Sequence, residues 1–284
     1  MTVEPDLADW VGRTQERTGV LTPDLAGMLG AAVSHAASAE VDLSIDAPMP
    51  VLWHWVAFPE FFPLSELGRD GHPKLGGFLP PVPLERRMWA GGKLSFSGRL
   101  HIGETLHKTS KIEAVDEKTG GAGTMVFVRV RHRISGSRGG SIEEQQDIVY
   151  LAIPDRFQPP KPVPAIADPD FAEDVPMNEA RLFRYSAATY NAHRIHYDWP
   201  YTRDVEKYPG LVVHGPMQAT LLMEAGIRHR RALPSHFRFR GVHPVFHQDD
   251  VRLLGKVIDD GAATDLCTAV SAGHQGMQAR IDWN

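Results

Sequence analysis

The stretch Thr124–Ile134 reads TMVFVRVRHRI, and its side chains alternate strictly between two sides. Valines fall on one side, at positions 126, 128 and 130, whereas Arg129 and Arg131 fall on the other. A period of two predicts a β-strand with one buried face. Similar patterns recur over residues 93–100, 105–115 and 142–151, and a glycine-rich turn is predicted at 117–123. This region is therefore predicted to be an antiparallel meander.

A helix is predicted upstream of the meander. Thr22 precedes Pro23 and Asp24, and the apolar-rich stretch LAGMLGAAVSHA follows. A threonine N-cap, a proline at the first helical position and an early acid together indicate a helix start. The apolar run VLWHWVAF at 51–58 predicts a strand, and the Gly- and Pro-rich residues 59–83 predict a loop.

The C-terminal half repeats this plan in a shorter form. A strand is predicted over residues 180–187 (ARLFRYSA), and a helix is predicted from Gly215-Pro216 through MQATLLMEAGIRHRRAL. Four more strands are predicted over residues 237–246, 251–258, 265–272 and 276–283. A long helix wrapped by a curved antiparallel sheet is the hot-dog arrangement. Two such halves predict the α+β class and a double hot-dog fold, in which two antiparallel sheets each wrap around a central helix.

A proline-rich stretch separates the two halves. Residues 153–176 contain seven prolines in 24 positions, and proline stiffens the chain and removes backbone donors. We predict an N-terminal domain over residues 1–152, a linker over 153–176 and a C-terminal domain over 177–284. The alternative is a long surface loop within one domain.

Composition limits the classes of function. The 284 residues are 42% hydrophobic and 23% charged, as in ordinary soluble proteins. The formal net charge of −5 leaves no basic excess for nucleic-acid phosphates. One cysteine, Cys267, excludes an intrachain disulfide and a multi-cysteine metal site. The first 17 residues lack the pattern of a signal peptide, and no apolar run reaches the roughly 18 residues of a membrane span. We expect a cytoplasmic protein without nucleic-acid or membrane partners.

The densest polar segment is residues 185–198, YSAATYNAHRIHYD. His193 and His196 are three residues apart, a spacing that could suit a metal. No third ligand follows at an obvious spacing, however, and Arg194 would repel a cation, so no metal is expected. A surface turn with incidental polar residues is the alternative to a functional site.

A second polar element follows at residues 211–217, LVVHGPM. Glycine at position 215 lets a ligand approach the backbone, and the first turn of a helix offers free N–H groups at the positive end of the dipole. Because Pro216 has no N–H, the donors include Gly215 and Met217. Such donors suit a thioester oxygen that gains charge as an enolate. The alternative is an ordinary helix start with proline at N1.

Together these two elements resemble the MaoC-like hot-dog family of hydratases and dehydratases. His196 matches the family's catalytic histidine, Asp198 its trailing acid, and Gly215 the glycine whose N–H polarises the thioester. Asn191 stands where the family has its catalytic aspartate. This departure points to a sub-branch of the family. The chain also resembles that sub-branch in three further stretches: RRMWAGGKLSF at 86–96, EEQQDIVY at 143–150 and RFRGVHPVF at 238–246. That branch holds itaconyl-CoA and mesaconyl-C4-CoA hydratases and mitochondrial-type 3-hydroxyacyl-thioester dehydratases.

The resemblance implies a hydratase of a short, branched, dicarboxylic enoyl-CoA. The N-terminal half would supply the acyl or CoA pocket and the C-terminal half the catalysis. His196 would serve as base and acid, Asn191 would orient the water, and Gly215 would bind the thioester oxygen. Further residues are candidates for binding the substrate: Arg194 as the preferred partner of a free carboxylate, then Arg184, His193 and the pair Arg86-Arg87; Asp198 and His214 beside the motif; Trp89 for an acyl tunnel; and Arg238, Arg240 or Lys256 for the CoA phosphates.

Other functions stay open from the sequence. They are a 3-hydroxyacyl-ACP or -CoA dehydratase of linear chains, a thioester hydrolase, and a non-catalytic acyl-thioester binding module. No cofactor is expected, because coenzyme A is part of the substrate. The family implies a homodimer.

Overall fold

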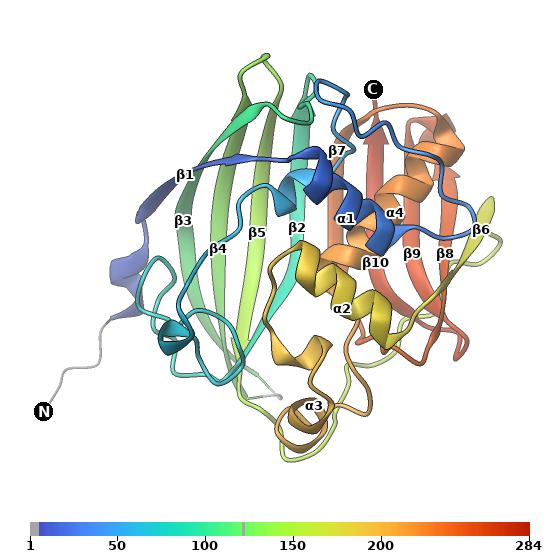
Figure 1. The fold of residues 1–284 in the computed structure, drawn as a ribbon. Helices are drawn as coiled ribbons and strands as arrows, with labels where there is room; N and C mark the ends of the chain where they lie inside the picture. Colours follow the sequence, from blue (N-terminus) through green and yellow to red (C-terminus); the bar gives the residue numbers. More distant parts are fainter. Residues whose placement is uncertain (1–5, 121–122) are drawn as a thin grey trace, which may run out of the picture.

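The computed structural model describes residues 6–120 and 123–284. The first five residues of the predicted N-terminal domain, and residues 121–122 of the turn predicted at 117–123, lie outside this part. One antiparallel sheet holds ten strands in the order β1-β3-β4-β5-β2-β7-β10-β9-β8-β6 (Figure 1). The strands are β1 (Thr14–Val20), β2 (Arg86–Ser97), β3 (Thr105–Gly120), β4 (Gly123–Gly136), β5 (Ser141–Leu151), β6 (Phe171–Pro176), β7 (Pro234–Gly241), β8 (Asp250–Ile258), β9 (Ala263–Val270) and β10 (Gln275–Trp283).

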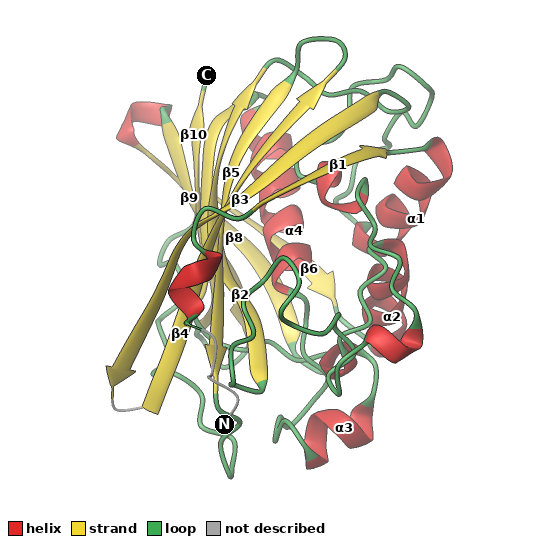
Figure 2. Ribbon diagram, turned by 90° about the vertical axis from the view of Figure 1, so that its left-hand side faces the viewer, coloured by secondary structure: helices red, strands yellow, loops and turns green. Residues whose placement is uncertain are grey.

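The α-helices lie on one face of the sheet (Figure 2). They are α1 (Pro23–Val33), α2 (Glu179–Ala188), α3 (Trp199–Asp204) and α4 (Gly215–Arg230). Helix α4 contacts the strands, and its buried Leu221 and Leu222 belong to the main core with Phe237 and Ile281. Helix α1 begins where the sequence predicts it, since the Thr22 hydroxyl accepts a hydrogen bond from the Leu25 amide at 3.2 Å.

The two halves meet edge to edge where Gly91–Ser95 of β2 pair with His236–Arg240 of β7. The two predicted sheets are thus continuous. A bulge between Trp89 and Gly91 interrupts the register of β2 with β5. The earlier residues of β2 pair with β5 and not with β7. We call this place, where β2 and β7 diverge, the seam.

Two strand predictions are wrong. Residues 180–187 lie in α2, because Asn178 caps a helix there: its side-chain oxygen accepts from the Arg181 amide at 2.9 Å. The buried residues Leu182 and Tyr185 are three apart, which is helical spacing. Residues 51–58 contain the 3-10 helix η2 (Trp53–Val56), because Leu52 adopts a left-handed φ of 73° and turns the chain. An apolar run alone does not distinguish a strand from a buried turn.

The proline-rich stretch packs against the C-terminal strands over part of its length. Its last six residues form β6, which pairs antiparallel with β8. Ile166 packs against a small cluster that contains the buried Cys267. The division into two domains and a linker stays a prediction. Among the described residues, no helix has the length and apolar character needed to cross a membrane.

Candidate active site

Four histidine rings, one from the N-terminal half and three from the C-terminal half, lie in a row. His72 belongs to the loop before β2, His193 and His196 to the connection between α2 and α3, and His214 is the N-cap residue of α4. The ring centroids of His72 and His193 are 4.2 Å apart. Those of His193 and His196 are 5.3 Å apart, and those of His196 and His214 are 3.6 Å apart. We call this arrangement the histidine row.

His196 is held by backbone that precedes α4. Its Nδ1 donates to the Val212 carbonyl at 2.7 Å, because that oxygen can only accept, and the lone pair of the ring is therefore on Nε2. The Val212 amide donates in return to the Ile195 carbonyl at 2.9 Å. The ring stacks on His214, whose Nε2 lies 2.8 Å from the Ser186 hydroxyl. The structure therefore brings His196 to the residue that immediately precedes Gly215.

Burial keeps the row uncharged. His193, His196 and His214 are 5%, 7% and 1% exposed. Burial lowers the pKa of His196 to about 4, although the bond to Val212 opposes this shift. Burial also lowers the pKa of His193 and of His214 well below the usual value, with neighbouring histidines adding to the effect. These imidazoles are therefore neutral near pH 7 and can accept a proton.

Gly215 is the first residue of α4, and Pro216 follows it. The amides at the start of a helix have no intrahelical partner, so the Gly215 N–H is a donor at the positive end of the dipole. A Cβ placed on Gly215 would lie 3.7 Å from the Trp89 carbonyl oxygen, so the helix start lies against the seam. Trp89 itself packs edge-on against Trp55, with centroids 5.0 Å apart.

Asn191 builds the loop that carries the histidines. Its side-chain oxygen accepts a hydrogen bond from the backbone N–H of His193 at 3.0 Å. The backbone N–H of Asn191 donates to the Ser186 carbonyl at 2.8 Å. One lone pair of Oδ1 is thus engaged within the loop, which leaves its second lone pair and the side-chain nitrogen for a water molecule.

Several predicted substrate-binding residues pair elsewhere. Arg194 and Asp198 form an ion pair with Nε–Oδ2 and Nη2–Oδ2 distances of 2.8 and 2.7 Å. Asp198 also caps α3 by accepting from the Tyr201 amide at 3.1 Å. It does not set the tautomer of His196, because the Val212 carbonyl does so.

Of two further arginines, one is engaged in an ion pair and one is exposed. Arg86 is buried against Glu206, with an Nε–Oε2 distance of 2.8 Å, and its guanidinium lies 4.5 Å from the Tyr208 ring centroid. Arg184 is exposed on α2. The structure therefore brings together His193, His196, His214 and Gly215, but not these arginines.

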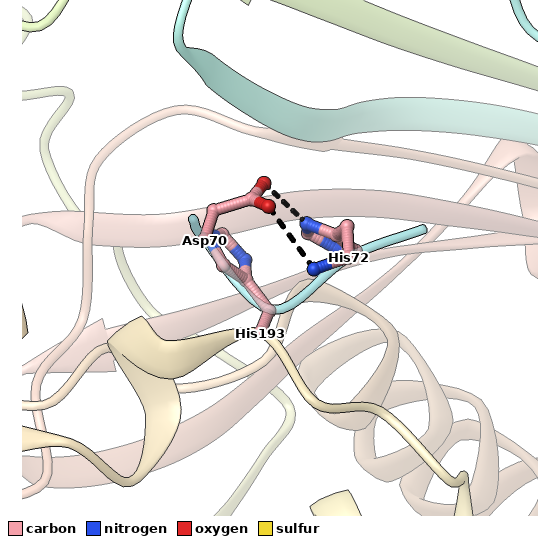
Figure 3. Close-up of side chains that lie close together, drawn as sticks. All are labelled: Asp70, His72 and His193. Atoms are coloured by element: carbon pink, nitrogen blue, oxygen red, sulfur yellow. Dashed lines mark hydrogen bonds and ion pairs between the residues drawn. The ribbon is translucent and has the colours of Figure 1, made fainter. Parts of the chain in front are cut away.

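Asp70 and His72, which no predicted motif includes, lie beside His193 (Figure 3). The Asp70 carboxylate accepts from His72 twice, from Nδ1 at 2.8 Å and from the amide at 3.0 Å. The loop docks closely, since the Arg194 amide donates to the Asp70 carbonyl at 2.9 Å. A Cβ on Gly71 would come within 2.0 Å of the Ala192 carbonyl oxygen. The Asp-Gly-His sequence at 70–72 was the available signal.

Arg87 and Tyr150 border the row from the sheet, where they are cross-strand partners on β2 and β5. The charge of Arg87 adds to the effect of burial in lowering the pKa of His72 to about 4. The Tyr150 hydroxyl is buried and finds no hydrogen-bond partner among the described residues. Within the same residues, no ion pair engages Arg87.

Asp70, His72 and His193 could in principle hold a metal, since one ligand atom from each lies within 4.8 Å of the others. Both carboxylate oxygens of Asp70 already accept hydrogen bonds from His72, however, and the nearby positive charge of Arg87 opposes a cation. The arrangement is better described as a hydrogen-bonded acid–histidine dyad, and the absence of a metal stays a prediction.

Comparison with known proteins identifies the family. The family model described as "Hydroxyacyl-thioester dehydratase type 2" matches residues 52–247. Mesaconyl-C(4)-CoA hydratase of Chloroflexus aurantiacus is 40% identical over 285 residues, covering 94% of this chain and 96% of that protein. A MaoC-like dehydratase from Phytophthora capsici aligns with a TM-score of 0.72 at 12% identity, over 99% of this chain and 98% of that one.

A Mycobacterium tuberculosis protein with a double hotdog fold aligns with a TM-score of 0.61 at 14% identity, over 100% of this chain and 99% of that one. These structural similarities confirm the predicted double hot-dog fold. The sequence match over more than half of the chain confirms the suspected relationship as well. The chain belongs to the hydroxyacyl-thioester dehydratase type 2 family.

Proposed function

We propose that this protein is a hydratase of a short, branched, dicarboxylic enoyl-CoA, with mesaconyl-C4-CoA or itaconyl-CoA as the substrate. The observation that carries the proposal is a buried, neutral His196 that stacks on the residue before the Gly215 amide. This places a proton acceptor next to a donor for the thioester oxygen. The relative from Chloroflexus aurantiacus supports the class of substrate.

The proposed chemistry needs one proton carrier. His196 Nε2 accepts a proton from water while the water oxygen bonds to C3 of the enoyl group. The electrons of the C2=C3 π bond move toward the thioester oxygen, which accepts a hydrogen bond from the Gly215 N–H. His196 then returns the same proton to C2, and a lowered pKa favours this return. The water is thus added across the double bond, and the enzyme ends unchanged.

Arg87 is the best candidate for the free carboxylate of the substrate. The sequence favours Arg194, but the structure engages that guanidinium with Asp198 and engages Arg86 with Glu206. The charge of Arg87 instead acts on His72 and His193. A guanidinium without an ion-pair partner among the described residues is suited to a carboxylate.

The CoA phosphates have a candidate site on the helix-free face of the sheet. A groove of about 670 Å³ is lined there by Lys93, Arg238 and Arg240, which alternate along their strands with buried residues such as Phe237. Ala90 also lines the groove and follows Trp89, whose carbonyl lies next to Gly215. The groove therefore reaches the seam one residue from the carbonyl that lies next to Gly215. Lys256, a further candidate, instead donates to the Ala167 carbonyl.

A panel of crotonyl-, octenoyl-, itaconyl- and mesaconyl-CoA, followed by loss of enoyl absorbance, tests the proposal. We expect fastest turnover of a dicarboxylic thioester. The variant His196→Ala should lose roughly two to four orders of magnitude in kcat and keep its fold, because it removes the proton carrier. Near-normal turnover in this variant would contradict the mechanism.

The family description favours one second candidate, a dehydratase of linear 3-hydroxyacyl thioesters. Preference for octenoyl-CoA over the dicarboxylic substrates would support it. Thiol release would indicate a thioester hydrolase, and saturable binding without turnover would indicate a binding module. The homodimer and the cytoplasmic location are proposals that light scattering and cell fractionation can test.

A further inference from the structure

We propose that His72, held by Asp70, is a second catalytic residue, which binds the attacking water together with His193 next to His196. This inference rests on the proposed hydratase function. Water that attacks a carbon must be held in one orientation, and its two O–H groups need two acceptors. His196 Nε2 supplies one acceptor. The Asn191 side-chain oxygen already accepts one hydrogen bond, from the His193 amide, so the unengaged ring nitrogen of His72 is the better candidate for the other.

The Asp70–His72 dyad leaves Nε2 of His72 free to accept a hydrogen bond from water. The Asp70 carboxylate can only accept, so His72 Nδ1 carries the proton in their 2.8 Å hydrogen bond. The lone pair of His72 is therefore on Nε2. The same logic applies to His196, whose Nδ1 donates to Val212. His72 and His196 therefore each have an unprotonated Nε2. In each ring the tautomer is fixed by an acceptor outside the row, which is Asp70 for His72 and the Val212 carbonyl for His196.

Ring nitrogens of His72 and His193 lie close to each other. Their ring centroids are 4.2 Å apart, and nitrogens of the two rings lie within 4.8 Å of each other. Hydrogen bonds of about 2.8–3.0 Å allow one water molecule to contact two nitrogens at such a separation. The Nε2 of His193 is buried and has no hydrogen-bond partner within the described part of the chain. Buried polar atoms are normally satisfied, so this one indicates a position built for a polar ligand.

The position of the dyad is fixed by docking between the two halves. The turn at Gly71 adopts a φ of +89° and presses against Ala192, while the Arg194 amide donates to the Asp70 carbonyl. Both contacts lie in the segment that carries His193 and His196. The N-terminal half therefore contributes a reactive group to a site that the sequence places in the C-terminal half.

In the reaction, His72 accepts the hydrogen bond of the O–H that stays on the product hydroxyl. His196 takes the other proton and returns it to C2, so His72 ends in the same protonation state as it began. Asp70 contacts neither water nor substrate and is a positioning residue. Its substitution by asparagine would let the amide donate to Nδ1 and shift the His72 proton to Nε2, where it would repel the water proton.

Three variants test the inference on the full chain with mesaconyl-CoA. His72→Leu removes the acceptor but suits a partly buried site, and we expect kcat to fall by roughly 10²–10⁴-fold with KM within threefold. His72→Gln keeps a neutral acceptor near the Nε2 position and should recover part of the loss. If His72 only filled space, kcat of His72→Leu should be at least as high as that of His72→Gln, because leucine fills an apolar space at least as well as glutamine. Asp70→Asn should lower kcat and move the His72 proton in ¹⁵N-histidine NMR spectra.

A matched control is His101→Leu, in the turn between β2 and β3. His101 is as exposed as His72 and lies three residues from its own acid, Glu104. Its replacement should leave kcat unchanged. Wild-type kcat in both His72 variants, with His196→Ala inactive, would overturn this inference alone. Wild-type kcat in His196→Ala would overturn the proposed function as well. If His72→Leu does not fold, the isosteric Asp70→Asn carries the test, and an unchanged kcat in it contradicts the dyad.

Discussion

The N-terminal half buries a second polar cluster, and it differs from the histidine row in how fully its atoms are paired. Glu144 on β5 accepts from His54 Nε2 at 3.1 Å and from the Trp55 indole N–H at 3.0 Å. His132 uses both ring nitrogens, with Ser110 at 2.8 Å and Gln146 at 3.1 Å. Three of the four histidine ring nitrogens in this cluster are therefore engaged.

The histidine row engages three of its eight ring nitrogens within the described residues: Nδ1 of His72, Nδ1 of His196 and Nε2 of His214. Both clusters are largely buried, so burial alone does not separate a structural network from a reactive site. A paired network resists opening, whereas free lone pairs in a dry site suit the binding of a polar ligand. The contrast predicts a loss of stability in one cluster and a loss of catalysis in the other.

The largest effect should follow from Glu144→Ala. The change leaves His54 and the Trp55 indole without their shared acceptor, and each buried donor left unsatisfied costs about 1–3 kcal/mol. Urea denaturation measures the free energy of unfolding. The adjacent Glu143→Ala is the control, because its ion pair with Arg133 is exposed and contributes about 0.2–1 kcal/mol. A selective loss of kcat in Glu144→Ala at unchanged stability would remove the contrast between the clusters.

Local patterns predicted much of the fold, because they act within a few residues. The alternation at Thr124–Ile134 lies within β4, and the threonine cap before Pro23 begins α1 as predicted. The strand prediction at 180–187 is wrong although the Asn178 cap of α2 is also a local signal. The Arg194–Asp198 pair is local as well, since the two residues are four apart and join the 3-10 turn η4 (Arg194–His196) to the N-cap of α3.

The candidate site could be predicted only in part. His196, His214 and Gly215 come from neighbouring segments, and the resemblance to the MaoC-like family implied that His196 and Gly215 act together. Asp70 and His72 lie in a Gly- and Pro-rich loop, and their position depends on close docking against Ala192, far along the chain. Long-range pairs of this kind leave no periodic pattern in a single sequence.

A further test concerns Arg87, the charged residue that borders the histidine row. We expect Arg87→Gln to lower kcat/KM for mesaconyl-CoA by roughly 10–100-fold, as for the loss of a hydrogen bond to a charged group worth about 1.5–3 kcal/mol. Crotonyl-CoA has no free carboxylate, so its kcat/KM should change by less than about threefold if the effect is confined to that contact. Arg184→Gln on the exposed side of α2 is the control and should affect neither substrate. Equal losses on both substrates would indicate that Arg87 supports the site as a whole.

The pH profile should show the smallest change, and it tests whether the row is neutral because it is buried. Protonation would block His196 as a base, so activity falls as pH drops through its pKa, which burial lowers to about 4. The same applies to His72, where burial and the charge of Arg87 lower the pKa to about 4. Between pH 8 and pH 5.5 we expect kcat/KM to change by less than about twofold, whereas an ordinary histidine would be only about a tenth neutral at pH 5.5. The hydration rate under kcat/KM conditions measures this, with thermal melting at each pH to confirm that the protein stays folded. A midpoint near 6.5 would mean that the active imidazole is solvated, and the distinction between the two clusters would then rest on pairing alone.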